Sequence, residues 1–343
     1  MNKKWLWCCF GLCISKVCSA DSVQLYGLVD QGVQINLQES QASIEDHFKI
    51  KQGNKMASRI GLKGREEISP SHFVFFNLEG ETNPNHPTTL FKRRNLLGYE
   101  NRQLGQITLG LQSSVSFDIA RLIDPSGLIR QKYVIDDLSG TFNGRHGNKW
   151  IDQAIKYSYR SDHFNFITSY QFDGEQHNNH HKNFAVGLSY QQGDRLFAGS
   201  YSQSQPSMYK GSSANPQIIN AGITQKIGKV HLKLGVSHSD LSPATPPALA
   251  KRHRPSLEKL QNIGIGFKYQ VKPHIDIFSA AYRQKSNTVS ESAMYGNKYV
   301  LGGNYHLSKH THFYAFLNHA NGSDSGKKID KITSATVGMV HRF

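Results

Sequence analysis

The chain has 343 residues, of which 38% are hydrophobic and 19% charged, with 40 Lys and Arg against 25 Asp and Glu. All four cysteines lie within the first 20 residues, which excludes disulfides and cysteine–metal chemistry from the rest of the chain. Beyond residue 20 no apolar run approaches the ~18 residues of a membrane-spanning helix, and no Pro- or Gly-rich linker divides the chain into domains.

The first 20 residues have the pattern of a secretory signal peptide. Basic Lys3 and Lys4 precede a short apolar run from residue 5 to residue 14, and small residues occupy the positions before a cleavage site after Ala20. Lipidation of Cys18 is the alternative, but Ser15-Lys16-Val17 is a poor lipoprotein box. We therefore expect residues 1–20 to be removed and residues 21–343 to form one domain in a bacterial cell envelope.

After the signal peptide, hydrophobic and polar residues alternate over segments of roughly 9–15 residues, the pattern of strands in a membrane β-barrel. We predict sixteen such segments, an even number, as in bacterial single-chain barrels. They are 23–37, 54–67, 71–82, 91–101, 105–113, 151–160, 163–172, 181–192, 194–205, 217–227, 229–240, 258–270, 274–285, 297–308, 310–320 and 331–343. A mean hydropathy of −0.50 does not contradict this, since alternation hides the membrane character. A lysine on the lipid side costs roughly 2–4 kcal/mol at mid-bilayer, so the polar residues of each strand should face inward.

The final segment has the clearest alternation. One face carries Thr333, Ala335, Val337, Met339 and Phe343, and the other carries polar or small residues. A strand that ends on an aromatic is typical of outer-membrane barrels, and we expect Phe343 to be the signal that the assembly machinery reads.

The predicted connections alternate between short and long. Turns of about one to three residues fall at 68–70, 102–104, 193, 228 and 271–273, a length typical of hairpins. The longer segments are 38–53, 83–90, 173–180, 206–216, 241–257, 286–296 and 321–330. Short turns should therefore share one rim of the barrel and long loops the other.

Residues 114–150 form an exceptional connection. Structureless loops longer than ~15 residues are usually functional or disordered. This one carries Phe117, Ile119, Leu122 and other apolar residues, so we expect it to fold into the lumen and narrow it as a constriction loop.

Several motifs resemble the Gram-negative porins of the Neisseria, Comamonas and Bordetella type. They are Ser22 to Asp30, Ser58-Arg59-Ile60-Gly61-Leu62-Lys63-Gly64-Arg65-Glu66-Glu67, Phe73 to Glu81, Phe91-Lys92-Arg93-Arg94 and Gly105 to Gly110. The resemblance implies a homotrimeric general diffusion porin of the outer membrane, a passive channel without cofactors. It also implies that basic wall residues face acidic residues on the third loop. Carried over, these are Arg59 and Arg93 (or Arg94) on the wall, and Asp118 and Asp124 on the loop.

Strand parity adds further basic residues to the expected lumen. Lys63 and Arg65 share a face with Arg59, while Lys233 and Lys268 lie on inward faces of later strands. After residues 1–20, which contain three lysines and no acid, the chain carries 37 basic and 25 acidic residues. Fixed cations along a narrow passage attract anions, so we expect a mild anion preference.

The sequence departs from the family at Leu111, where many members have arginine, and the usual arginine before the sixth strand is missing. Arg145 or Lys149 is a candidate replacement. We expect Glu79 and Glu81 to point inward and pair with lumen arginines.

Other features favour simple explanations. The histidines at 177, 180 and 181 lack the surroundings of a metal site, and no metal is expected. The basic stretch 251–254 would meet lipopolysaccharide or simply solvent. No catalytic motif is present, so an enzymatic barrel is disfavoured. A substrate-selective channel, a surface adhesin and a soluble secreted β-protein remain alternatives to a general porin.

Overall fold

The computed structural model describes residues 22–37, 48–82, 91–127, 129, 149–172, 182–204, 217–240, 257–288, 293–324 and 327–343. Among these residues, no helix is long and apolar enough to cross a membrane. The predicted signal peptide, Arg145, the histidines at 177–181 and the basic stretch 251–254 lie outside the described residues, so the predictions made for them stay predictions.

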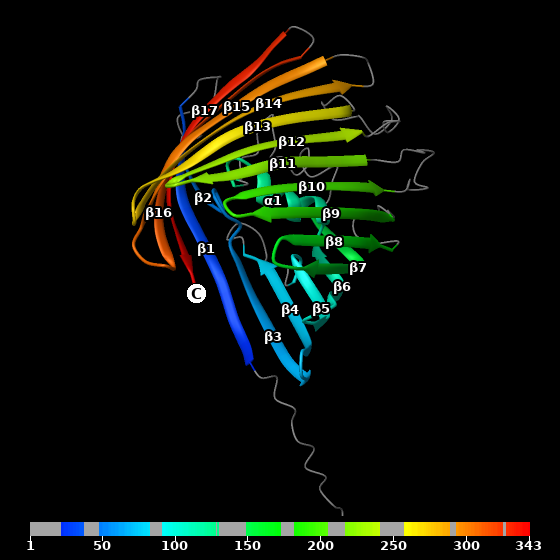
Figure 1. The fold of residues 1–343 in the computed structure, drawn as a ribbon. Coiled ribbons are helices and arrows are strands. Elements are labelled where there is room, and N and C mark those ends of the chain that lie inside the picture. Colours follow the sequence, from blue (N-terminus) through cyan, green and yellow to red (C-terminus); the bar gives the residue numbers. More distant parts are fainter. Residues whose placement is uncertain are drawn as a thin grey trace, which may run out of the picture.

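The described chain consists of antiparallel strands and one helix, α1 (Val115–Ile123) (Figure 1). The strands of the first half are β1 (Ser22–Asn36), β2 (Phe48–Gln52), β3 (Arg59–Ser69), β4 (His72–Glu81), β5 (Arg94–Asn101), β6 (Gly105–Ser113), β7 (Trp150–Arg160) and β8 (Phe164–Gln171). Those of the second half are β9 (Asn183–Gln192), β10 (Arg195–Ser204), β11 (Gln217–Ile227), β12 (Val230–Asp240), β13 (Leu257–Lys272), β14 (Ile275–Thr288), β15 (Ala293–His306), β16 (Thr311–Asp324) and β17 (Lys327–Arg342).

The sheet closes into a barrel because β1 pairs with both β17 and β3. β2 also pairs with β1, through Gln31 opposite Gln52, while Leu28 lies opposite Arg59 of β3. β2 and β3 are thus two parts of one barrel strand, interrupted at residues 53–58. The 17 strands of the sheet therefore make sixteen barrel strands, and the predicted fold class is confirmed.

Backbone pairing extends further than the hydrophobic pattern predicted. Each predicted segment overlaps one barrel strand, and the short turns share one rim, where Gly193 and Gly228 have φ values of 56° and 57° that suit glycine. The loops predicted at 286–296 and 321–330 are wrong, because β14 and β16 run to Thr288 and Asp324. Alternation reports only the membrane-facing part of a strand, whereas polar residues beyond it can continue the hydrogen-bonded ladder.

Apolar side chains cover the outer face of the barrel. On β12, Leu232, Leu234 and Val236 are 42%, 41% and 43% exposed, whereas Ser237 and Ser239 on the opposite face are buried. On β17, Val337 and Met339 are exposed in the same way, as is Phe343 directly after the strand. The predicted outward set is confirmed for these strands, and the polar face points inward.

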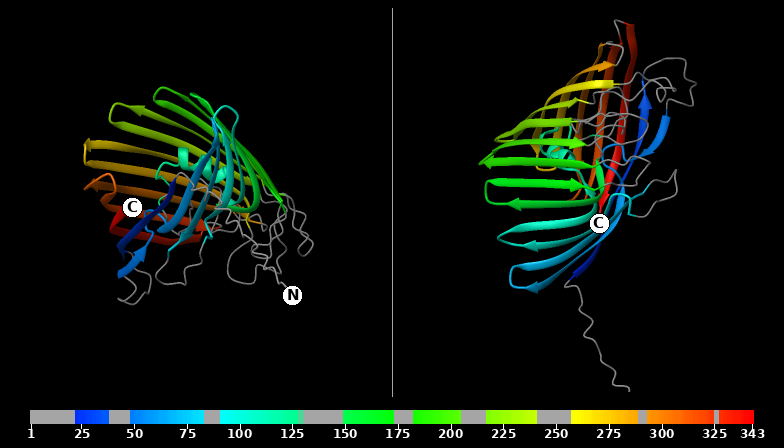
Figure 2. Two further views of the ribbon diagram at one scale, coloured as in Figure 1. Left: turned by 90° about the horizontal axis from the view of Figure 1, so that it is seen from below. Right: turned by 90° about the vertical axis from the view of Figure 1, so that its right-hand side faces the viewer.

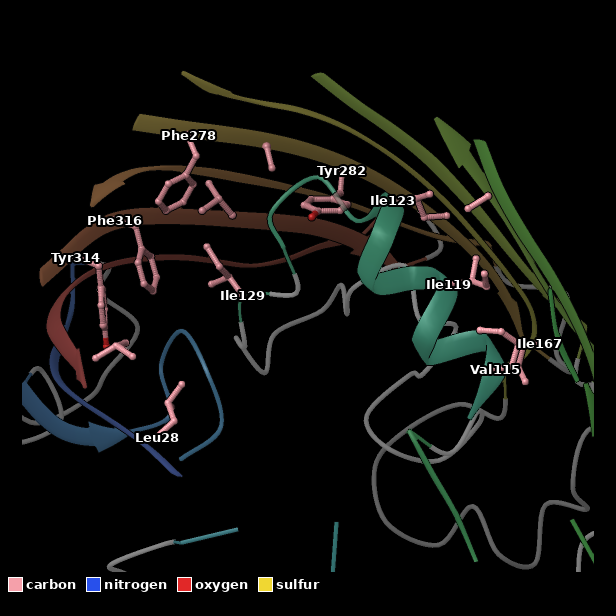
Figure 3. Packing of buried hydrophobic residues seen from close by; sticks show 14 of the residues in the cluster. Leu28, Val115, Ile119, Ile123, Ile129, Ile167, Phe278, Tyr282, Tyr314 and Phe316 are labelled. Carbon is pink, nitrogen blue, oxygen red and sulfur yellow. The ribbon is translucent and has the colours of Figure 1, made fainter. Parts of the chain in front are cut away.

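The inner face is not uniformly polar, and here the sequence interpretation is wrong. The inward positions of β14 and β16 carry Phe278, Tyr282, Tyr314 and Phe316, all of them buried. Figure 3 shows these rings in one cluster that extends to the end of α1. Alternation cannot distinguish an inward residue that meets water from one that packs against another inward segment, where apolar surface is favoured.

Candidate functional site

A stripe of cations runs along the inner face of β3. Arg59, Lys63 and Arg65 alternate with Ile60 and Leu62, which are exposed on the outer face. The Lys63 ammonium lies 5.5 Å from the centre of the Tyr26 ring. The Arg65 guanidinium donates to Glu100 at 2.9 Å. Because Arg65 is near the end of β3 at Ser69, the stripe extends toward the short-turn rim.

A buried carboxylate organises the neighbouring arginines. Glu79, on β4, is 1% exposed. Its oxygens lie 2.6 Å from Nε of Arg93, 3.3 Å from Nη1 of Arg94 and 3.6 Å from Nε of Arg59. The Tyr26 hydroxyl donates to the same carboxylate at 2.9 Å. We call Glu79 and these three arginines the Glu79 cluster; three cations share one buried anion, which leaves positive charge on this wall.

Two further groups support the Glu79 cluster. Arg93 also reaches Glu81 at 3.4 Å, so the expected pairing of both acids with lumen arginines is confirmed. The Arg93 and Arg94 guanidiniums lie 4.7 Å and 5.8 Å from the centre of the Trp150 ring, which stabilises a cation next to an aromatic face.

Helix α1 forms directly after β6 because the local sequence has helix signals. Ser114 is the N-cap and its hydroxyl accepts from the Phe117 amide at 3.2 Å, an effective way to begin a helix. Asp118 lies in the first turn and Arg121 in the last, where each charge interacts favourably with the helix dipole. Val115, Ile119 and Ile123 follow a four-residue spacing on one buried face.

That buried face lies against the inner side of the barrel wall (Figures 2 and 3). A Cβ added at Gly187 on β9 would come within 2.7 Å of Val115, and one at Gly222 on β11 within 2.7 Å of Ile123. The absence of side chains at these positions lets the helix approach the strands closely. Glycines on two strands therefore determine where α1 lies.

The two predicted loop acids have different positions. Asp118 binds Lys156 of β7 at 2.8 Å, and the same ammonium donates to the Ser113 carbonyl at 2.6 Å. Asp124 is fully buried at the end of α1, where its carboxylate accepts from Tyr282 at 3.0 Å and from Ser126 at 2.9 Å. Asp118 thus faces the lumen, while Asp124 anchors the helix end.

A polar cavity of about 800 Å³ lies between α1 and the inner faces of β3 to β8. Its charged lining is mainly basic, with six cations and two acids. The cations are Lys63, Arg65, Arg94, Arg121, Lys156 and Arg160, and the acids are Glu100 and Asp118. We call this space the charged cavity.

The structure brings together some of the predicted site residues and separates others. Lys63, Arg65, Arg94 and Asp118 line the charged cavity, and Arg59 and Arg93 belong to the adjacent Glu79 cluster. Lys233 lies under α1 and donates to the Asp124 carbonyl at 3.2 Å. Lys268 lies at another cavity, 3.1 Å from Asp276.

Sequence reasoning missed Arg121, Lys156 and Arg160. The two β7 residues share inward parity, so the pattern already used for β3 could have found them. Arg121 follows Asp118 by three residues, which places both on one side of a helix. Lys149 is a candidate to replace the missing family arginine. Its ammonium lies 5.5 Å from the centre of the Phe117 ring.

Within the described ranges, no group of three or more His, Cys, Asp or Glu residues could hold a metal ion.

A closed barrel with an apolar outer face and a charged, water-accessible interior defines a membrane channel of the β-barrel class. The sequence profile of Gram-negative porins matches residues 12–325, so the chain belongs to the Gram-negative porin family. It is an outer-membrane porin, a passive diffusion channel for small hydrophilic solutes.

Similar proteins agree with this assignment. An outer membrane porin of Bordetella pertussis is 25% identical over 371 residues, covering 94% of each chain. The anion-selective porin of Comamonas acidovorans has the same fold, with a TM-score of 0.74 at 18% identity, over 94% of this chain and 99% of that one. The trimer form of OmpT from Vibrio cholerae matches with a TM-score of 0.73 at 14% identity, over 94% and 99%.

Proposed function

We propose that this porin conducts small anions in preference to cations. The observation that carries the proposal is the lining of the charged cavity, where six cations face two acids. Among the described residues, Arg65, Arg94 and Lys156 have carboxylate partners, and no ion pair is found for Lys63, Arg121 or Arg160. Fixed positive charge in a narrow passage raises the local concentration of anions and repels cations. The anion selectivity of the Comamonas porin with the same fold supports this choice.

The proposal includes a constriction built by residues 114–150. Helix α1 brings Asp118 and Arg121 to the charged cavity, opposite the cationic stripe of β3. Arg59, Arg93 and Arg94 would supply the field on the wall, and Asp118 would oppose it from the loop. Asp124 and Lys233 hold α1 in place rather than contacting solutes.

The assembly is proposed to be a non-enzymatic homotrimer, as in the trimer form of the Vibrio cholerae protein. Phe343 would act in recognition by the assembly machinery, and lipopolysaccharide would surround the long loops. In the structure, the Gly27 amide donates to the Phe343 carbonyl at 2.9 Å, so the last residue also takes part in barrel closure.

Single-channel recordings in planar bilayers with a salt gradient test the proposal. We expect large ohmic steps that close in threes, and a reversal potential on the anion side. A reversal potential on the cation side would contradict the anion preference. Small steps that one class of solute blocks would instead indicate a substrate-selective channel.

A further inference from the structure

Residues 53–58 leave the β-ladder and turn into the barrel. Asp30 of β1, fully buried, holds this segment from several sides. Its carboxylate accepts from the Lys55 and Met56 amides at 2.8 Å and 2.6 Å, and its carbonyl accepts from the Gly53 amide at 2.9 Å. The Ser58 hydroxyl accepts from the Asp30 amide at 2.9 Å. A short segment with this many bonds to one residue has a defined inward conformation.

From this segment, Lys55 extends along the inner face of the barrel to β15, three strands beyond β1 in the order β1–β17–β16–β15. Its ammonium donates to the side-chain oxygen of Asn304 on β15. It also lies 5.6 Å from the centres of the Phe278 and Tyr314 rings, a cation–π arrangement on two aromatic faces. The Tyr314 hydroxyl donates to the Asp30 carboxylate at 2.6 Å. Tyr314 thus contacts both the Lys55 ammonium, through its ring, and the carboxylate that accepts from the Lys55 amide.

Hydrogen bonds and ion pairs also hold Asn304 and its neighbours on β14 and β15 in place. Asn304 donates to Asp276 of β14, and Asp276 lies 2.6 Å from His306 and 3.1 Å from Lys268. Strand register places Asp276 opposite Asn304 and Asn304 opposite Tyr314. The acceptor of the Lys55 ammonium is therefore held in place by its neighbours.

A second inner cavity lies next to this contact. It has a volume of about 470 Å³ and lies at the short-turn rim, lined by β12 to β15 and the turn that follows β15. Its lining includes His231, Lys268 and His274, and it reaches Asp276 and His306. Asp276 accepts the hydrogen bond from Asn304, so the second cavity lies next to the contact between Lys55 and Asn304.

We propose that residues 53–58, through the Lys55 side chain, form a second constriction that blocks this side of the lumen. Solutes then pass only through the charged cavity, and Lys55 is a specificity-determining residue for solute size. The inference rests on the proposed diffusion function. It concerns a strand interruption far in the sequence from the loop at 114–150.

The test compares two substitutions of Lys55 in the full-length porin. Lys55→Ala removes the part of the side chain that reaches β15, whereas Lys55→Met keeps the length and the contact with both rings. We expect Lys55→Ala to raise single-channel conductance by about 1.5-fold, because the lining residues set the width of a wet pore. Swelling of proteoliposomes should also become faster for larger sugars. Lys55→Met should stay near the wild-type conductance. Lys272 is an exposed lysine at the end of β13, so Lys272→Ala controls for the loss of one charge.

A labelling experiment reports the blockage independently of conductance. Because the four native cysteines all lie in residues 1–20, Asn304→Cys introduces a thiol that can be followed alone in the processed protein. Asn304 is buried at 8% exposure, so a bulky water-soluble thiol reagent should react slowly in the Asn304→Cys protein. It should react at least tenfold faster when Lys55→Ala is added.

Three outcomes are distinguishable. If wild type conducts and Lys55→Ala leaves both conductance and labelling unchanged, the second constriction is wrong. If Lys55→Ala and Lys55→Met raise conductance equally, Lys55 acts through charge and the steric proposal is overturned. If no variant conducts, although heat-dependent gel migration shows folded barrels, the diffusion function itself fails. If Lys55→Ala does not fold, Lys55→Gln with the labelling readout decides in its place.

Discussion

The inward-facing residues on two sides of the barrel differ in character. On the side of β3 to β8, inward residues are charged and line a cavity of about 800 Å³. On the side of β14 to β17 and β1, inward residues such as Phe278, Tyr314 and Phe316 are buried in an apolar cluster with Leu28 and Val340. Both sides use the same strand alternation. The comparison shows that an inward position takes its character from what it faces, water on one side and packed protein on the other.

The largest expected effect comes from the charged side, where the Glu79 cluster contains a buried carboxylate. Glu79→Gln would leave Arg59, Arg93 and Arg94 without their shared anion. Removing one partner of a buried ion pair costs about 3–5 kcal/mol, so the free energy of unfolding should fall by that order. Urea titration of the barrel in detergent or lipid vesicles measures it.

Glu81→Gln is the matched control, because Glu81 binds the same Arg93 but its side chain is 36% exposed. Exposed ion pairs contribute about 0–1 kcal/mol, so this variant should resemble wild type. Equal losses for the two variants would show that the Glu79 cluster is not a buried electrostatic centre.

A smaller effect is expected where α1 contacts the wall. Gly187→Val would place its Cβ 2.7 Å from Val115 and push the helix away from β9. Overpacking of this kind costs about 1–3 kcal/mol. Displacement of α1 toward the charged cavity should also reduce single-channel conductance.

Gly199→Val on β10 is the control, since a Cβ there meets only the Asn220 carbonyl, at 3.3 Å. This variant should keep the wild-type conductance. A normal conductance in Gly187→Val would indicate that α1 does not limit the passage.

The smallest effect on stability is expected at Lys63. Lys63→Glu changes an exposed side chain of the charged cavity, and the free energy of unfolding should change by less than about 0.5 kcal/mol. The reversal potential in a salt gradient should nevertheless move toward cations. The shift should shrink near 1 M salt, where the Debye length is about 3 Å. A salt-independent shift would mean that Lys63 acts through pore shape instead of charge.

The sequence alone determined the barrel, its strand number and its outward face. These follow from period-two alternation, because the cost of a charge in lipid applies at every strand without reference to distant residues. The same alternation placed Arg59, Lys63 and Arg65 on the inner face. Lys156 and Arg160 occupy inward positions of β7 in the same way. Family motifs pointed to Arg93, Arg94 and Asp118, which the structure places in or next to the charged cavity.

Only the tertiary structure decided which inward residues meet water. The position of α1 depends on Gly187 and Gly222, which come from strands more than 60 residues beyond the helix. Burial of Asp124 depends on Tyr282, and the inward turn at 53–58 depends on Asp30 and Asn304. Such contacts join residues separated by up to 249 positions. Periodicity describes only neighbours along one strand, so it cannot reveal which segment fills the space in front of that strand.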